Sequence, residues 1–97
     1  MYKWYLAKPF QAIVVNKSTV NELSKELEKQ FVFYGIDENG NKCYDDDLSI
    51  YHKVGGYFYI KGIGTKKIND GDYIVLRHEN FDIVTQEYFK RNFIELF

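Results

Sequence analysis

The C-terminal third of the chain carries its clearest local signals: a tight turn, two short strands and a capped helical turn. Residues 69–71 read Asn-Asp-Gly, and these residue types tolerate the positive φ angles that tight hairpin turns require. Residues 73–76 and 81–84 are mostly β-branched or aromatic, which favours strands. Thr85 follows a valine and precedes Phe89 by four places, the spacing of an N-cap with a hydrophobic staple. These signals specify local structure and carry no chemistry.

A second strong signal lies at residues 19–30. Thr19 and Glu22 have the spacing of a capping box, in which the glutamate side chain reaches back to the cap. The residues that follow are mostly polar, and they leave one narrow apolar stripe, made of Val20, Leu23 and Leu27. This pattern predicts an amphipathic helix over residues 19–30 that packs on a sheet.

Most of the remaining chain favours β-structure. Apolar and aromatic residues predict strands over residues 10–15, 31–36, 57–61 and 93–97. A further strand begins at residues 42–44, is interrupted by Asp45, Asp46 and Asp47, and resumes over residues 48–54. Asn39-Gly40 is a strong hairpin signal, and Gly55-Gly56 predicts a break between strands. Together the signals predict one α+β domain over residues 1–97. Its mainly antiparallel, twisted sheet would have about six strands, with the helix on one face and a helical turn near residues 85–91.

The charges are balanced in total but uneven along the chain. Thirteen basic and fourteen acidic side chains give a net charge of −1. Nucleic-acid-binding proteins generally show a basic excess, so no direct nucleic-acid partner is expected. Residues 31–56 hold two Lys against five acidic residues, a local charge of −3. An acidic segment of this kind favours a partner with a basic surface.

Cysteine usage and hydropathy bear on location. The single cysteine, Cys43, cannot form an internal disulfide, so nothing indicates an oxidising compartment. The N-terminus lacks the apolar core of a signal peptide, and no stretch approaches the roughly 18 apolar residues of a membrane helix. We expect a cytoplasmic protein without a membrane segment.

No motif indicates catalysis or metal binding. Cys43 with His52 or His78 offers a nucleophile and a base, but no third group stands at a recognisable spacing. A calcium loop needs acidic residues at alternate positions with a glycine and a distal glutamate, and that spacing is absent. We therefore predict a protein that is not an enzyme and has no cofactor and no metal.

The candidate partner site is acidic. It comprises Asp37, Glu38, Asp45, Asp46 and Asp47. Charge runs are usually solvated faces, and a solvated hairpin flank is one interpretation. The other is an acidic patch that meets a basic partner surface.

Two further segments allow alternatives. Residues 62–67 resemble a phosphate-binding loop but lack its spacing and its helix, so a hairpin turn is favoured. On that interpretation Lys61, Lys66 and Lys67 protect an edge strand against aggregation. Tyr57 and Tyr59 could stack nucleobases, but without a basic groove beside them core packing is favoured.

The order of these signals resembles a widespread family of small uncharacterised proteins encoded by phages and prophages. Residues 8–12, Lys-Pro-Phe-Gln-Ala, match the opening of that family. Residues 71–75, Gly-Asp-Tyr-Ile-Val, match its Gly-Asp-aromatic-Ile-Ile/Val strand, and residues 81–96 match the strand, helical turn and closing strand that follow. The resemblance implies a phage genomic context and a small α+β fold. It implies no characterised activity.

The leading hypothesis is a non-enzymatic phage or prophage binding protein that covers a host protein. Its specific version is an inhibitor of a bacterial defence nuclease, such as a CRISPR effector, whose basic nucleic-acid-binding surface would meet the acidic patch. The alternatives are a small-molecule or nucleotide sequestering module, with residues 62–67 and Tyr57 and Tyr59 near the ligand, and a minor virion or assembly component. The sequence leaves the oligomeric state open.

Overall fold

The chain forms an α+β fold of two antiparallel sheets. The computed structural model describes residues 5–7, 10–77 and 80–92. Within them the elements are β1 (Tyr5–Ala7), β2 (Phe10–Val14), α1 (Val20–Glu26), β3 (Phe31–Ile36), β4 (Lys42–Cys43), the 3-10 helix η1 (Leu48–Ile50), β5 (Lys53–Ile60), β6 (Gly64–Ile68), β7 (Tyr73–Arg77), β8 (Asn80–Val84) and α2 (Gln86–Asn92). The predicted strand at residues 93–97 lies outside the described residues.

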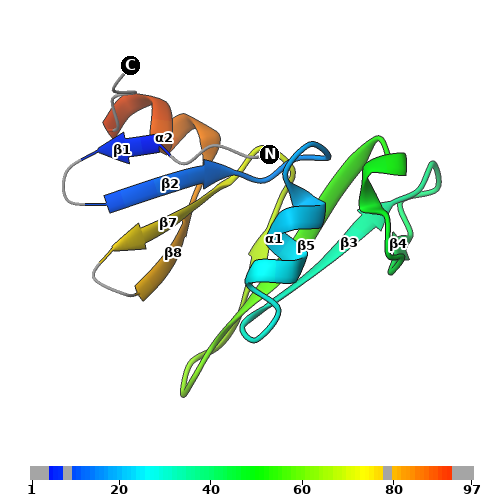
Figure 1. Ribbon diagram of the computed structural model, residues 1–97, viewed down its shortest axis with the longest axis horizontal. Helices are drawn as coiled ribbons and strands as arrows, with labels where there is room; N and C mark the ends of the chain where they lie inside the picture. Colours follow the sequence, from blue (N-terminus) through cyan, green and yellow to red (C-terminus); the bar gives the residue numbers. More distant parts are fainter. Residues whose placement is uncertain (1–4, 8–9, 78–79, 93–97) are drawn as a thin grey trace.

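The strands form two sheets of four, which lie side by side in Figure 1. Sheet A has the order β1-β2-β7-β8, and sheet B has the order β4-β3-β5-β6. The predicted fold class and antiparallel pairing are confirmed, but the single sheet of about six strands is wrong. The reason is topological, because the chain leaves sheet A after β2, builds all of sheet B, and returns to pair β7 with β2.

One hydrophobic cluster joins both sheets and α1. Its buried members are Ile13, Val15, Val20, Leu23, Phe31, Phe33, Leu48, Val54, Phe58, Ile68, Ile74 and Ile83. In sheet B the rings of Phe31 and Phe58 stack at 4.6 Å between centroids. Phe81 of sheet A meets Phe31 edge-on at 5.3 Å, so the aromatic contacts cross from one sheet to the other.

The predicted Asn-Asp-Gly turn joins β6 of sheet B to β7 of sheet A. Gly71 has a φ of +92°, which a glycine adopts without steric penalty. Its N–H donates to the Val15 carbonyl at 2.8 Å, and the Asp70 carboxylate accepts from the Val54 N–H at 3.0 Å. The tight turn is therefore confirmed, but it links the two sheets and does not close a hairpin.

Helix α1 is shorter than the predicted helix over residues 19–30, which was wrong in length. The Leu27 carbonyl accepts the N–H groups of Gln30 at 3.3 Å and Phe31 at 3.0 Å, so the chain turns directly into β3. The apolar stripe is confirmed, since Val20 and Leu23 are buried and Leu27 packs against the same core. Glu28, Lys29 and Gln30 are exposed polar residues, so no apolar contact extends the helix.

The predicted capping box was wrong. Thr19 is the N-cap residue, but its side chain makes no capping hydrogen bond. The Thr19 hydroxyl instead donates to the Val14 carbonyl at 2.7 Å and accepts from the Asn16 N–H at 3.1 Å. The hydroxyl thus ties the start of α1 to the end of β2.

Strand β5 contains the glycine pair that was predicted to break it. A Cβ atom at Gly56 would lie 2.7 Å from the Val32 carbonyl oxygen, and one at Gly55 would lie 3.0 Å from the Tyr34 ring. The two glycines therefore let β3 approach β5 closely, which is a recognised role of glycine inside a sheet. The strand predicted over residues 48–54 is also wrong, because η1 occupies its first part.

Helix α2 confirms the predicted helical turn near residues 85–91. The Thr85 hydroxyl accepts the Tyr88 N–H at 3.1 Å, as an N-cap does. Phe89 stacks on Tyr73 at 3.7 Å between ring centroids. The helix covers the outer face of sheet A through a cluster of Ala12, Val75, Phe89 and the partly buried Tyr73 and Val84.

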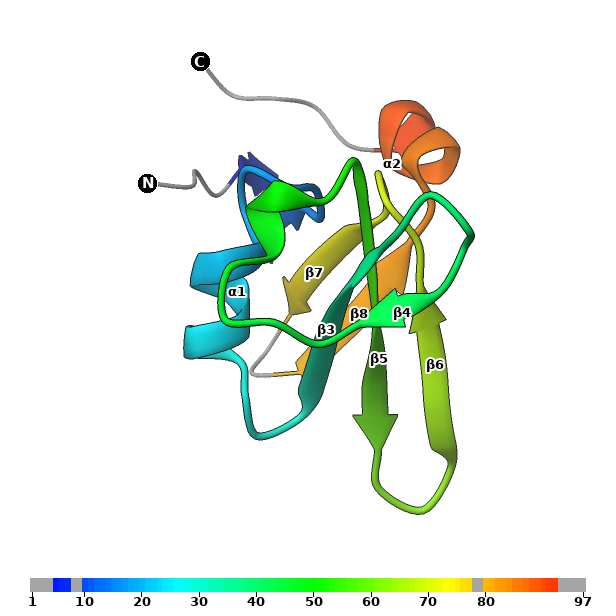
Figure 2. The same ribbon diagram turned by 90° about the vertical axis from the view of Figure 1, so that its right-hand side faces the viewer.

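The glycine hairpins are also confirmed. Gly40 has a φ of +82° in the turn between β3 and β4, where the Asp37 N–H donates to the Asn41 carbonyl at 3.0 Å. Gly62 has a φ of +83° in the turn between β5 and β6. Figure 2 shows this second hairpin extending from the bottom of the molecule, away from both helices.

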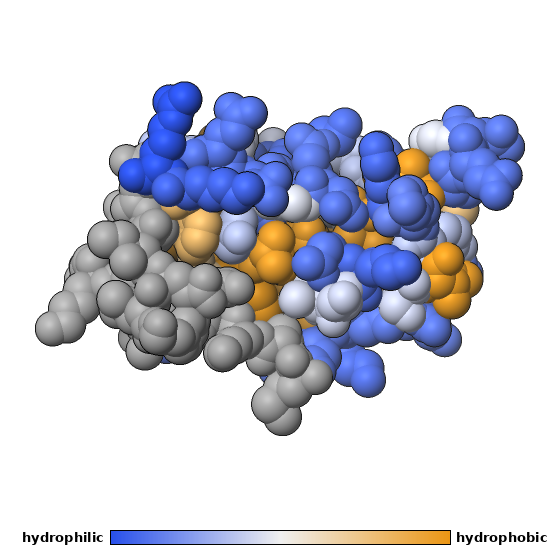
Figure 3. All heavy atoms as spheres, turned by 90° about the horizontal axis from the view of Figure 1, so that it is seen from above, coloured by the Kyte–Doolittle hydropathy of each residue, from blue (hydrophilic) through white to orange (hydrophobic). Residues whose placement is uncertain are grey.

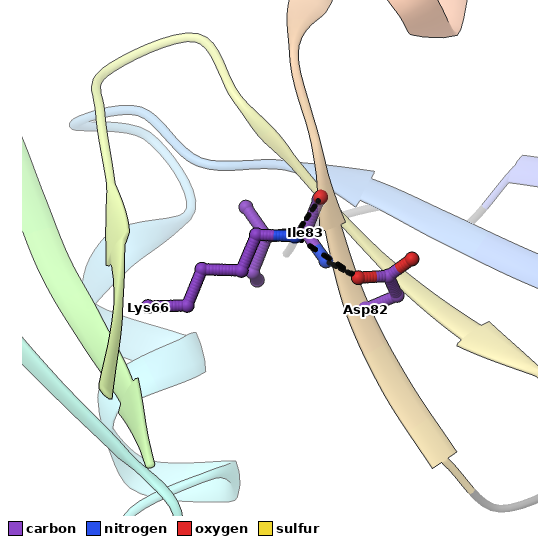
Figure 4. Close-up of polar contacts among 3 residues, drawn as sticks. All are labelled: Lys66, Asp82 and Ile83. Atoms are coloured by element: carbon purple, nitrogen blue, oxygen red, sulfur yellow. Dashed lines mark hydrogen bonds and ion pairs between the residues drawn. The ribbon is translucent and has the colours of Figure 1, made fainter. Parts of the chain in front are cut away.

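Strands β6 and β8 each form one edge of their sheet, and Lys66 connects them. Its ammonium donates to the Ile83 carbonyl at 3.1 Å and lies 3.3 Å from Asp82 Oδ1 (Figure 4). The same carboxylate accepts the Ile83 N–H at 2.8 Å. The edge of β8 is therefore hydrogen-bonded at Ile83 on both its N–H and its carbonyl.

Candidate functional site

A groove of about 880 Å³ lies where the β3–β4 hairpin meets the segment after η1. Its lining residues are Ile36, Asp37, Glu38, Gly40, Ile50, Tyr51, His52 and Lys53. Ile50 keeps 69% of its surface exposed although it is a large apolar side chain. Figure 3 shows hydrophobic atoms at the surface among hydrophilic ones at the end of the molecule that holds β4.

The Tyr51 ring lies directly on the backbone of β3. A Cβ atom at Gly35 would lie 2.0 Å from the ring atom Cδ2 of Tyr51, so only glycine leaves room for this ring. The Tyr51 hydroxyl donates to the Asp45 carboxylate, and this hydrogen bond raises the pKa of Tyr51. The Tyr51 side chain, which lines the groove, is thus fixed by its packing on Gly35 and by the charge-assisted hydrogen bond from its hydroxyl to Asp45.

Asp37 and Glu38 place carboxylates at the mouth of the groove. Asp37 Oδ1 accepts the N–H groups of Asn41 at 2.8 Å and Asn39 at 2.9 Å, which closes the hairpin turn. These backbone hydrogen bonds hold the pKa of the Asp37 carboxyl below its usual range, so the group is ionised at neutral pH. Glu38 is exposed next to it.

The structure divides the five acidic residues that the sequence grouped together. Asp37 and Glu38 line the groove, and Asp45 is bonded to the lining residue Tyr51. Asp47 faces another way, because its Oδ1 accepts from Asn21 Nδ2 at 2.9 Å and from the Ser49 N–H at 3.0 Å. Asp46 is exposed and does not line the groove.

The apolar part of the site was missed from the sequence. Ile50 and Tyr51 were assigned to a strand, although Asp47 stands where an N-cap belongs. In the structure Asp47 caps η1, and Leu48 is the buried residue of that helix. An Asp-x-Ser sequence is typical of a capped turn, so this signal could have predicted that Ile50 lies in such a turn and not in a strand.

Among the described residues, Cys43 and His52 do not form the hydrogen-bonded pair that a nucleophile needs. Cys43 Sγ lies 3.9 Å from Asp37 Oδ2 and 3.8 Å from the Asn41 carbonyl oxygen, and both of these atoms are acceptors. His52 lines the groove but forms no hydrogen bond with this thiol, and His78 lies outside the described residues. Across the described ranges, no group of three or more His, Cys, Asp or Glu could hold a metal ion.

The glycine-lysine segment at residues 62–67 forms a hairpin, as favoured. The Ile63 N–H donates to the Ile60 carbonyl at 3.0 Å, and strand β6 follows where a phosphate-binding loop would need a helix. Tyr59 keeps 54% of its surface exposed, so the expectation of core packing was wrong for this residue.

No protein-family model, curated protein or solved structure matches this chain. The resemblance to phage and prophage proteins therefore stays a prediction. In the part of the chain that the structure describes, no helix has the length and apolar character to cross a membrane.

Proposed function

We propose that the protein is a non-enzymatic binding protein of phage or prophage origin that acts by covering a host protein. The observation that carries this proposal is the groove between the β3–β4 hairpin and η1. It combines the exposed side chain of Ile50 with the carboxylates of Asp37 and Glu38. Protein interfaces combine such an apolar centre with a polar rim.

The occupant is a basic segment of the host protein that carries one apolar side chain. The lining residues include two carboxylates, Asp37 and Glu38, and one lysine, Lys53. Asp45 adds a further carboxylate, which is hydrogen-bonded to Tyr51. Opposite charge on the partner would steer its approach, and the apolar side chain would cover Ile50. The nucleic-acid-binding surface of a defence nuclease has this chemistry, so inhibition of such a nuclease is the specific form of the proposal.

Capture from host lysate followed by mass spectrometry supplies a partner, which is then purified for calorimetric measurement of affinity. Ile50→Ser is expected to weaken binding by about tenfold or more, because it removes an apolar anchor. Glu38→Lys should weaken binding and reduce the salt dependence of the affinity, since the charge at this lining residue is reversed.

Asp46→Lys is the matched control, because it makes the same change of charge at an exposed residue outside the groove. Its affinity should stay close to that of the wild type. If Ile50→Ser and Glu38→Lys bind as the wild type does, or if all three variants lose affinity equally, the groove is not the docking site.

The non-enzymatic part of the proposal has its own test. Cys43→Ser is expected to keep partner binding and the biological effect within about threefold, whereas loss of a catalytic nucleophile typically lowers the rate by orders of magnitude. The assay is inhibition of the captured partner by purified wild type and variant. A loss of about a hundredfold in a variant that melts normally would assign the protein to the enzymes.

A further inference from the structure

The outer face of sheet B, opposite the core, is rich in tyrosine and lysine. Residues paired across antiparallel strands point to the same side of a sheet, and the register pairs Val32 with Tyr57, Tyr57 with Lys67 and Tyr59 with Thr65. Lys42 pairs with Ile36 on this same side, two places after Tyr34 along β3. The tyrosine–lysine face is defined as Val32, Tyr34, Lys42, Tyr57, Tyr59, Thr65 and Lys67 of the strands, with Tyr44 beside them.

The rings on this face form a supported layer. Tyr34 is only 1% exposed, and the rings of Tyr44 and Tyr57 lie 5.7 and 5.6 Å from it between centroids. Above this buried ring Tyr44 keeps 61% of its surface exposed, and Tyr59 on the next part of β5 keeps 54%. Two large planar side chains are therefore exposed on this face of the sheet, and Tyr44 is supported by the buried Tyr34 ring.

Two lysines lie beside Tyr57 on this face. Lys42 Nζ is 4.7 Å from the centroid of the Tyr57 ring and 5.3 Å from that of Tyr34, and it donates to the Tyr57 hydroxyl. This hydrogen bond lowers the pKa of Tyr57, which is consistent with a positive potential at the face. Lys67 stands opposite Tyr57 on β6, and none of the strand positions on this face carries an acidic residue.

We infer that the tyrosine–lysine face binds single-stranded nucleic acid, with bases stacked on Tyr44 and Tyr59 and phosphates on Lys42 and Lys67. Accessible aromatic rings beside cations are the arrangement by which sheet proteins bind single strands without base preference. A duplex keeps its base faces stacked internally, so it could not use the rings. An acidic protein could contact the same lysines, so binding of an acidic polypeptide is made an outcome of the test below.

This inference goes beyond the proposed function, because it concerns residues that do not line the groove and a different class of ligand. The balanced total charge argued against nucleic acid, but that total counts every residue equally. The register gathers lysines on one face, whereas Asp37 and Glu38 lie in the hairpin turn. A local basic surface therefore coexists with a net charge of −1.

The test is fluorescence anisotropy with labelled oligo-dT of about 16 nucleotides, which spans one site of this kind. The wild type should bind the single strand at low salt and bind a duplex of equal length at least about tenfold more weakly. Tyr59→Ala should lower the affinity by about 5- to 150-fold, the range for loss of one stacked base. Lys67→Gln should lower it and reduce the slope of log K against log salt by about 0.7.

Lys25→Gln is the matched control, because it removes an exposed lysine from α1, away from this face, and should bind as the wild type does. Ile50→Ser should also bind oligo-dT normally, which separates this site from the groove. The inference is overturned if the wild type does not bind oligo-dT, if duplex binds equally well, or if Tyr59→Ala binds normally. Binding of polyglutamate in place of oligo-dT would assign the face to an acidic protein and likewise overturn it.

Discussion

Leu23→Asp is expected to abolish cooperative folding. Leu23 is fully buried in the cluster that joins α1 to both sheets. An aspartate there would place an unpaired charge in an apolar environment, at a cost of several kcal/mol. A domain of this size is stable by only about 5–15 kcal/mol, so the folded state would lose most of its advantage. Thermal unfolding followed by circular dichroism measures the effect.

Lys25→Asp is the control for this experiment. Lys25 lies two places further along the same helix and is exposed, so an aspartate there remains in water. Its melting temperature should stay within a few degrees of the wild type, because exposed substitutions typically change stability by about 0.5 kcal/mol or less. A cooperative, near-wild-type melt of Leu23→Asp would show that α1 does not dock on the core as described.

Gly35→Ala is expected to destabilise the protein by about 1–3 kcal/mol, the usual effect of overpacking. The added methyl group would lie 2.0 Å from Cδ2 and 2.3 Å from Cγ of the Tyr51 ring. These atoms are near the base of the side chain, so Tyr51 could escape the clash only by leaving its position. Its hydrogen bond to Asp45 and the floor of the groove would change with it.

A double-mutant cycle isolates this contact. In a Tyr51→Ala background the ring is absent, so Gly35→Ala should have little further effect on the free energy of unfolding in urea. The coupling between the two substitutions is then close to the whole effect of Gly35→Ala alone. Additive free energies would mean that the ring does not pack on Gly35.

The features predicted correctly from the sequence depend on neighbouring residues. The turn at Gly71, the hairpin at Gly40 and the cap at Thr85 each require a backbone conformation or a hydrogen bond within a few residues. Their signals are therefore complete within a short window of sequence. The same holds for the buried positions of α1, which follow from helical periodicity.

The features predicted wrongly depend on residues far away in the sequence. From the sequence, Gly55 and Gly56 predict a break between strands. In the structure they lie inside β5, because Tyr34 and Val32 of β3 pack against them. The capping box is a separate case, because the Thr19 hydroxyl donates to the Val14 carbonyl, which is only five residues away. The prediction of a single sheet was wrong because strand pairing has no local signal. Strand β6 pairs with β5, whereas β7 pairs with β2, which lies far away in the sequence.

The candidate site, too, was predicted only in part from the sequence. Asp37 and Glu38 were found because they belong to a conspicuous hairpin turn. Ile50 was missed because the local Asp-x-Ser signal of η1 was not used. For the tyrosine–lysine face, base stacking by Tyr57 and Tyr59 was raised from the sequence, but only the strand register shows that Lys42 and Lys67 lie on the same side. The net charge could not indicate this face, because a total over the whole chain does not show where the charged side chains lie.

The contact from Lys66 to β8 has a consequence for the behaviour of the chain at high concentration. A strand from another molecule could add to β8 only by displacing Asp82 from the Ile83 N–H and Lys66 from the Ile83 carbonyl. Acetylation of Lys66 would remove the charge that holds this arrangement. The Ile83 carbonyl would then be open to a donor from another strand, and only the Asp82 contact with the Ile83 N–H would still protect this edge.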